Sequence, residues 1–316
     1  MTTPAFTRLA LGTSAAAALL VGCGGWRSPT GALGMLPQTG AITARIDQER
    51  SWMLPQARSE DLLYISDYYG VHIFSYPKVQ HVGDIYGFAS PAGLCSNQSG
   101  DVFVTDTQTY HVYEYAHGST KRLKTLYDNY VDFNPVDCSV DLNTGDVATA
   151  SLDAAFVVIF PKAKEVPKVY YDRHASMYHC AYDDKGDLFV DQIYTRHHNY
   201  IGELAKGKTT FRNYLLDGRI AHSGGIQFDG QRVAIEDLKS LVVYRLSFSG
   251  NDAIVVGTTP LMGAKYLYQY SIQRKALIGP DLYGDVYFWK YPKGGSPVSA
   301  IQGFTDPYGS TISAGH

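Results

Sequence analysis

Five histidines lie in one part of the chain. Histidine is the side chain best able to bind a transition metal or to move a proton near neutral pH. The five are His174, His179, His197, His198 and His222. Neighbouring segments supply acids at Asp132, Asp137, Asp153 and Asp191. Imidazole binds transition metals and titrates near neutral pH, so this group could hold a metal ion or supply a general base. Because the spacing matches no known metal motif, the five histidines are candidates and the catalytic and metal-binding residues stay unassigned.

Tyrosines form a second group with chemical potential, since the chain holds 25 of them. Four stand in segments with loop character and are candidate binding residues: Tyr68, Tyr69, Tyr130 and Tyr308. A tyrosine offers apolar area and a hydroxyl together, which suits contacts with a sugar, a peptide or a protein. Any single ring could equally pack in the interior, so only the collective excess favours a binding surface.

The N-terminus has the pattern of an export signal, with Arg8 followed by an apolar run from Leu9 to Val21. That run is too short to span a bilayer as a stable helix. It ends at Leu20-Val21-Gly22-Cys23 and resembles the bacterial lipobox, which implies cleavage before Cys23 and lipidation of that cysteine. We therefore expect a signal peptide at 1–22, a lipidated cysteine with a flexible tether at 23–60, and an exported chain anchored to the cell membrane or outer membrane, facing the periplasm or the cell surface.

Composition limits the function of the remaining residues, 61–316. Over the whole sequence, charged residues make up 18% and aromatic residues 13%, a balance that suits half-buried strands. The formal net charge of −3 provides no basic surface for nucleic acid. Neither a phosphate-binding GxxxxGK[ST] loop nor a dinucleotide-binding glycine motif occurs. We expect no nucleic-acid partner, a monomer, and no cofactor other than a divalent metal in the case of an enzyme.

An internal repeat organises this domain. The segments 87–93 and 303–309 share Gly, Phe, Pro and Gly at the same spacing, and turns ending in Gly-Asp recur at 100–101, 145–146 and 186–187. Strands of alternating character follow such turns at 62–67, 102–106, 147–151, 188–192, 233–237 and 277–281. A repeat of about 40 residues with four short strands per unit is typical of a β-propeller.

The expected fold class is therefore all-β: a six-bladed β-propeller of four-stranded antiparallel blades. The chain starts with the second strand of blade one at Leu62, while a spare strand remains at Gly309–Ala314. We expect this C-terminal strand to join blade one and close the ring, which removes the open sheet edges.

The strand and turn pattern resembles NHL-repeat propellers and the related gluconolactonase-like proteins over nearly all of residues 61–316. In those families an aspartate at the end of the second strand caps the following turn, and Asp67, Asp106, Asp237 and Asp281 fall at that position. Ser151 and Gln192 replace it in blades three and four. The channel metal ligands of the gluconolactonase-like enzymes have no residue-by-residue match in this chain.

Three cysteines fall in the expected innermost strands. Cys138 and Cys180 occupy equivalent positions, and Cys95 is shifted by one residue, which turns its side chain to the other face. A Cys138–Cys180 disulfide is conceivable in an oxidising compartment. Buried free thiols are the favoured interpretation, because inner strands of neighbouring blades usually lie beyond the roughly 7 Å limit between bridged Cα atoms.

Two classes of function stay open. The favoured one is a membrane-anchored, extracytoplasmic binding module that holds a protein, peptide or glycan on its loop face, where loops between blades converge. The alternative is a lactonase-like or lyase-like enzyme with a histidine-containing and possibly divalent-metal-dependent channel site. The first needs no convergent set of titratable groups, and the sequence offers no convincing one. The identity of the ligand or substrate cannot be read from the sequence.

Overall fold

The chain is built almost entirely of strands. A computed structural model describes residues 50–127, 133–152, 155–164, 166–172, 176–193 and 199–315, all within the compact unit Ala41–His316. In this described part the helical elements are two short 3-10 helices, η1 (Pro55–Ser59) and η2 (Pro161–Ala163). The predicted all-β class is confirmed. No helix in these ranges is long and apolar enough to cross a membrane.

Three sheets have four antiparallel strands each. The first contains β5 (Pro91–Ser96), β6 (Val102–Asp106), β7 (His111–Tyr115) and β8 (Arg122–Leu126). The second contains β9 (Asn134–Val140), β10 (Val147–Leu152), β11 (Phe156–Phe160) and β12 (Lys168–Tyr171). The third contains β21 (Ser271–Gln273), β22 (Ala276–Asp281), β23 (Asp285–Lys290) and β24 (Ser299–Gln302). These are the four-stranded antiparallel blades that the repeat predicted.

A larger sheet of eight strands holds two further sets of four. One set is β13 (Cys180–Tyr182), β14 (Leu188–Ile193), β15 (Asn199–Leu204) and β16 (Arg212–Leu216). The other is β17 (Ser223–Phe228), β18 (Val233–Asp237), β19 (Val242–Ser249) and β20 (Asp252–Pro260). A short parallel pairing of β16 with β20 joins the two sets at their outer strands. The sequence pattern did not predict this junction.

The remaining sheet has five strands and combines both ends of the described chain. Its members are β1 (Trp52–Met53), β4 (His81–Ile85), β3 (Val71–Ser75), β2 (Leu62–Ser66) and β25 (Ser310–Ser313), in that order. The spare strand expected at Gly309–Ala314 is β25, and it pairs antiparallel with β2. At the opposite edge, β1 adds a strand to β4 from a segment that the sequence pattern assigned to the tether.

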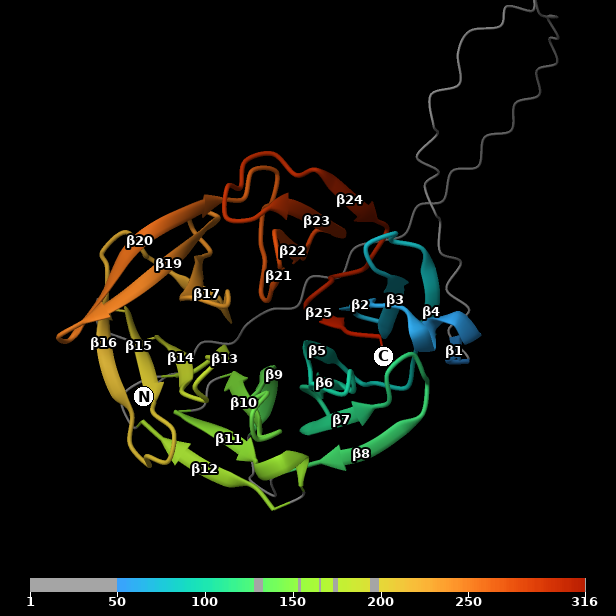
Figure 1. Cartoon of the computed structure of the whole chain (residues 1–316), viewed down its shortest axis with the longest axis horizontal. Coiled ribbons are helices and arrows are strands. Elements are labelled where there is room, and N and C mark those ends of the chain that lie inside the picture. The colour runs from blue at the N-terminus through green and yellow to red at the C-terminus, as the bar shows by residue number, and fades with distance from the viewer. Residues whose placement is uncertain are drawn as a thin grey trace, which may run out of the picture. The chain divides into compact units, whose positions relative to one another are not determined.

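The sheets are arranged radially around a common centre (Figure 1), with β25, β5, β9, β13, β17 and β21 innermost. Alternating side chains of each strand pack toward opposite neighbours. In β6, Val102 and Val104 join the apolar cluster shared with the sheet of β2, while Phe103 joins the cluster shared with the sheet of β9. The apolar core therefore lies between adjacent sheets, all around the ring.

The glycines of the repeated segments allow the innermost strands to approach one another. A Cβ atom on Gly93 would lie 2.6 Å from the Cα of Asp137, and one on Gly309 would lie 2.7 Å from the carbonyl oxygen of Ala92. Real side chains do not tolerate such distances, so both positions require glycine. The repeat detected in the sequence thus marks the places where backbones come closest at the centre.

The close approach at Gly93 also corrects the prediction for the cysteines. Cys95 and Cys138 form a disulfide with their Cα atoms 5.7 Å apart, and Cys180 is a buried free thiol. Cys138 and Cys180 occupy equivalent positions in their sheets, so each side chain faces the preceding sheet and the two cannot meet. The one-residue shift of Cys95 turns it toward Cys138, and both lie in the apolar cluster between β5 and β9. The preference for free thiols was wrong for Cys95 and Cys138.

Replacing Cys95 and Cys138 together with alanine is expected to lower the free energy of unfolding by about 2–4 kcal/mol, because the bridge closes a loop between residues 43 apart. Chemical denaturation of the variant and the wild type measures the difference. In a form carrying Cys23→Ser, denatured protein should show one reactive thiol before reduction and three after it. Three reactive thiols without reductant would contradict the assignment.

Candidate functional site

One face of the ring collects the loops between sheets and the loops between the second and third strands of each sheet; we call it the loop face. Aspartates at the ends of second strands tie these two kinds of loop together. Asp106 accepts hydrogen bonds from the backbone N–H groups of Ala89 and Ser90 on one loop and of Gln108 and Thr109 on the other. Asp67, Asp237 and Asp281 make equivalent contacts. The predicted capping role of these four aspartates is confirmed.

Two blades use other residues for the same task. Ser151 accepts a hydrogen bond from the N–H of Asn134, as the pattern implied. In the sheet of β14, however, the carboxylate of Asp191 accepts from the N–H groups of Tyr178 and His179, whereas Gln192 donates to Asp172. The prediction that Gln192 takes the place of the capping aspartate was therefore wrong, because Asp191, one residue earlier, has that role.

The centre of the ring is bridged by an amide and a carboxyl group from different sheets. Gln269 precedes β21, and its Nε2 donates to Asp137 of β9 over 2.5 Å and to the carbonyl of Leu94 on β5 over 3.0 Å. Its Oε1 accepts from the N–H groups of Leu94 and of Ser310 on β25. Gln269 and Asp137 are both fully buried. A single side chain thus joins three innermost strands and fills the space between them.

The surroundings of Asp137 raise the pKa of its carboxyl group. Burial raises its pKa to about 6, against the opposing influence of nearby His179 and of hydrogen bonds from the N–H groups of Cys138 and Cys180. These two N–H groups lie 2.8 and 3.1 Å from its carboxylate oxygens. Burial without a fully compensating cation explains the direction of the shift.

His179 lies next to this bridge and is itself buried. Its Nδ1 is 3.4 Å from the carboxylate of Asp191. Burial alone would lower its pKa, but Asp191, Asp137 and the backbone carbonyl of Tyr268 together raise it. Buried and engaged with Asp191, His179 joins two segments of its sheet. It is not an available base for a substrate in solution.

Above the bridge, three tyrosines form a continuous aromatic row on the loop face. Tyr268 and Tyr308 stack with ring centroids 4.3 Å apart and an interplanar angle of 11°. Tyr266 meets Tyr268 edge to face at 4.9 Å. The backbone of the segment that carries Tyr268 is fixed beneath by Gln269, which donates its N–H to the carbonyl of Tyr308. We call Tyr266, Tyr268 and Tyr308 the aromatic row.

A hollow opens on each side of the aromatic row. One, of about 420 Å³, is lined by Tyr268 and Tyr308 and by Thr107, Gln108, Tyr110, Asn134 and Val136. The other, of about 330 Å³, is lined by Tyr266 and by Asn199, His222, Ser223, Leu238 and Lys239. Both combine apolar surface with a few amide, hydroxyl or charged groups, which is the usual character of a binding site.

The structure brings some of the predicted site residues together. Tyr308 and exposed His222 line the two hollows, one on each side of the aromatic row. Tyr68 and Tyr69 meet edge to face at 5.2 Å, and their loop is hydrogen-bonded through the N–H of Tyr68 to Thr305, in the segment that also carries Tyr308. His179 lies below the surface. The predicted residues outside the described ranges are Cys23, Tyr130, His174, His197 and His198.

Sequence reasoning missed Tyr266, Tyr268 and Gln269. They lie in the long connection between β20 and β21, which contains none of the repeat motifs. The two tyrosines spaced as Tyr266-x-Tyr268 were the one sequence feature that could have indicated a binding surface there. A second missed group is His72, His81 and Asp84, which among the described residues could together hold a metal ion. None of the predicted histidines belongs to that group.

Buried Asp137 makes stability depend on pH. Its folded pKa of about 6 exceeds the unfolded value near 3.8, so between these values the folded state binds more protons and stability falls as pH rises. Between pH 4 and pH 7 the free energy of unfolding of the wild type should fall by on the order of 3 kcal/mol relative to that of Asp137→Asn, because asparagine does not titrate. Denaturation curves of both proteins at several pH values measure this difference, and parallel profiles would contradict it.

Comparison with known proteins supports the fold alone. No protein-family model and no curated protein sequence matches the chain. Among solved structures, a chain of a nidogen/laminin complex aligns with a TM-score of 0.67 at 12% identity, covering 80% of this chain and 98% of that one. A streptogramin B lyase aligns with a TM-score of 0.52 at 14% identity, covering 77% of this chain and 74% of that one. The chain therefore has a β-propeller fold.

Proposed function

We propose that this protein is a binding module that captures an extended ligand on its loop face, across the aromatic row. The observation that carries the proposal is the stack of Tyr268 on Tyr308 between two hollows. Stacked rings present a rigid surface that loses little conformational entropy on binding, and tyrosine is enriched at the centres of protein interfaces. A ligand lying over the row could place a side chain in each hollow.

A peptide segment of a protein partner is the ligand that suits these groups best. Gln108, Thr107 and Asn134 line the larger hollow beside the rings, and amide and hydroxyl groups can pair with a peptide backbone. One solved structure with this fold belongs to a complex of two proteins. A glycan would use the same rings and amides, so a glycan ligand is the competing outcome.

The proposal includes a six-bladed ring. In this interpretation the eight-stranded sheet is two blades whose outer strands β16 and β20 touch, and β1 is an extra strand on blade one. The innermost strand of blade one is then β25, so both ends of the domain share one blade. The NHL-like strand and turn pattern supports this count.

We also propose that Cys23 is lipidated and that the propeller is displayed outside the cytoplasmic membrane. The lipobox-like segment Leu20–Cys23 supports lipidation, and a disulfide between Cys95 and Cys138 is consistent with an oxidising compartment. Two or more acyl chains would hold the protein stably at the membrane surface.

The enzyme alternative receives less support. Of the five candidate histidines, His179 is engaged with Asp191 and buried, and His222 lies at the surface beside Asn199 and Tyr266. The centre of the ring, where a channel site would lie, is occupied by Gln269 and Asp137. A lactonase-like or lyase-like reaction would therefore need groups other than the described predicted histidines.

Replacing Tyr268 and Tyr308 with alanine should weaken ligand capture by about 30-fold or more, since central aromatic anchors contribute about 2 kcal/mol or more. A random peptide library selected on the wild-type protein supplies the probe, and binding of the enriched peptides is measured to both proteins. Leu142→Ser is the matched control, because Leu142 is 59% exposed in the turn after β9 at the opposite face.

The melting temperatures of the variant and control must stay near that of the wild type for the comparison to count. Tyr266→Ala, which leaves the central stack intact, should give a smaller loss. Equal binding by wild type and the Tyr268→Ala/Tyr308→Ala variant would remove the aromatic row from the proposed site. Enrichment of no peptide, together with binding on a glycan array, would favour the glycan outcome.

Cys23→Ser should abolish lipidation and release the chain from the membrane fraction. Expression of the full chain in a bacterial host with labelled palmitate measures both effects. Label retained by the serine variant, or a wild type that carries none, would contradict the anchoring proposal and leave the binding proposal untouched.

A further inference from the structure

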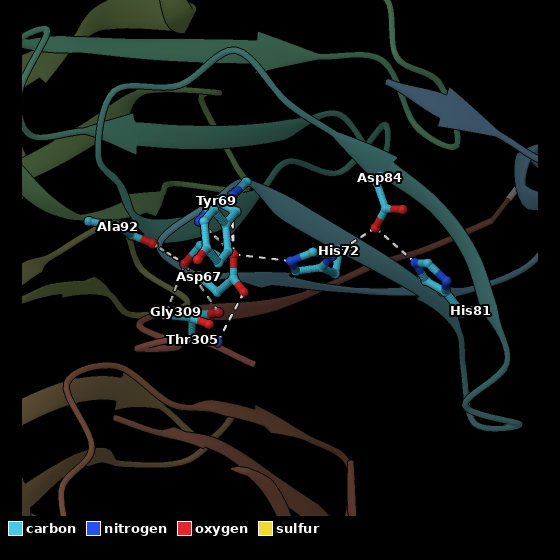
Figure 2. Close-up of polar contacts among 10 residues, drawn as sticks. Asp67, Tyr69, His72, His81, Asp84, Ala92, Thr305 and Gly309 are labelled. Atoms are coloured by element: carbon cyan, nitrogen blue, oxygen red, sulfur yellow. Dashed lines mark hydrogen bonds and ion pairs between the residues drawn. The ribbon is translucent and has the colours of Figure 1, made fainter. Parts of the chain in front are cut away.

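A group of metal-binding side chains lies at the outer part of the five-stranded sheet, away from the aromatic row. His72 on β3 and Asp84 on β4 are directly opposed in the antiparallel ladder. The Nδ1 of His72 lies 2.7 Å from Oδ1 of Asp84, and the Nε2 of His81 lies 2.8 Å from the same oxygen. Figure 2 shows the two imidazole rings pointing at Asp84 from opposite sides. Three potential ligand atoms from two strands thus lie within 4.8 Å of one another.

A β-bulge makes this convergence possible. His81 and Asp84 are three residues apart on β4, and strict alternation would place them on opposite faces of the sheet. The register shifts between Ile73 and Phe74, so that Ile73 pairs with Gly83 while Phe74 pairs with His81. The extra residue in β4 returns His81 to the face of Asp84. Bulges that re-aim a side chain in this way are often found beside functional sites.

Outer groups contact two of the three ligands, His72 and Asp84, as they do in known metal sites. The other ring nitrogen of His72, Nε2, lies 3.0 Å from Oδ1 of Asp67, whose carboxylate is in turn held by backbone N–H groups of its turn. Trp52 on β1 stands opposite Asp84, and its Nε1 donates to Oδ2 over 2.7 Å. The carboxylate of Asp67 beside His72 and the indole N–H of Trp52 on Asp84 restrain these two ligands from the outside.

Burial shields the group on all but one side. The side chains of His72 and Asp84 are each 6% exposed, whereas that of His81 is 19% exposed. Aromatic rings enclose the group: Phe74 lies 5.1 Å and Trp52 5.2 Å from the ring of His81, and Phe304 lies 5.6 Å from that of His72. Solvent therefore reaches the group from the side of His81.

We propose that His72, His81 and Asp84 form a binding site for a divalent transition metal, with Zn²⁺ the best match. Two imidazole nitrogens and one carboxylate oxygen are the ligands that Zn²⁺ takes in sites with three protein ligands, and a water completes the tetrahedron. Ligand atoms about 2.0–2.2 Å from the metal lie about 3.3 Å apart in that geometry. The observed 2.7 and 2.8 Å separations would widen by about half an ångström, and the two imidazole nitrogens, which lie within 4.8 Å of each other, would settle at the same spacing.

Metal binding would connect the edge strand to the loop face. Trp52 extends the site to β1, and Asp67 extends it to the segment of Tyr308, because its Oδ2 accepts the N–H of Thr305. A bound ion would hold β1, β3 and β4 to one another and support the loop that contains Tyr68 and Tyr69. The site stands on different residues from the aromatic row, so either proposal can fail alone.

Calorimetric titration of the chelator-treated full chain with ZnCl₂ tests the proposal. The wild type should bind at least one equivalent of Zn²⁺. Its melting temperature should rise, because an ion that binds only the folded state stabilises that state. His81→Gln, at the exposed side, should remove one equivalent or weaken it at least about 100-fold while its metal-free melting temperature stays near that of the wild type. Trp52→Phe should weaken the same equivalent about 10-fold.

Two controls locate the site. His222→Gln, and a variant with His174, His197 and His198 all changed to glutamine, should keep the equivalent that His81→Gln removes. Co²⁺ bound to the wild type should give the intense visible bands of a four-coordinate ion, and His81→Gln should abolish them. Zn²⁺ binding unchanged in His81→Gln, or an absence of any binding by the wild type, would overturn the proposal.

Discussion

The hydrogen bond between Gln269 and Asp137 is the contact on which the centre of the ring depends. Gln269 joins β5, β9 and β25, which come from parts of the chain as far apart as residues 94 and 310. The side-chain polar atoms of Gln269 and Asp137 all find partners, which offsets the cost of removing them from water. Only a narrow centre allows one amide to reach all three strands, and glycine at positions 93 and 309 keeps it narrow.

A filled centre determines where a ligand can bind. Asp137, His179 and Asp191, which would be attractive catalytic groups in an open channel, serve here to hold loops and strands together. The groups left at the surface above them are rings, amides and hydroxyls. The same side chains that exclude a ligand from the centre thus support the backbone that presents Tyr268 and Tyr308. This division of roles favours recognition on the loop face over chemistry inside the ring.

Much of the fold could be predicted from the sequence because the strands are short and recur at a regular spacing along the chain. The boundaries of the six predicted second strands match those of β2, β6, β10, β14, β18 and β22 to within one residue. The capping aspartates were also readable, since their position in the repeat sets their contacts. What failed depended on distances between strands. The Cys95–Cys138 bridge requires the close approach at Gly93, and the group of His72, His81 and Asp84 requires a bulge that no residue type announces.

Hydrogen–deuterium exchange of the full chain, with and without a peptide selected on the wild type, tests the central claim most directly. Recognition on the loop face predicts slower exchange on binding in segments 106–111, 260–270 and 303–309, which surround the aromatic row. The turns at 141–145 and 183–187, on the opposite face, should exchange as before. Protection confined to those turns, or none at the aromatic row, would contradict recognition by the loop face.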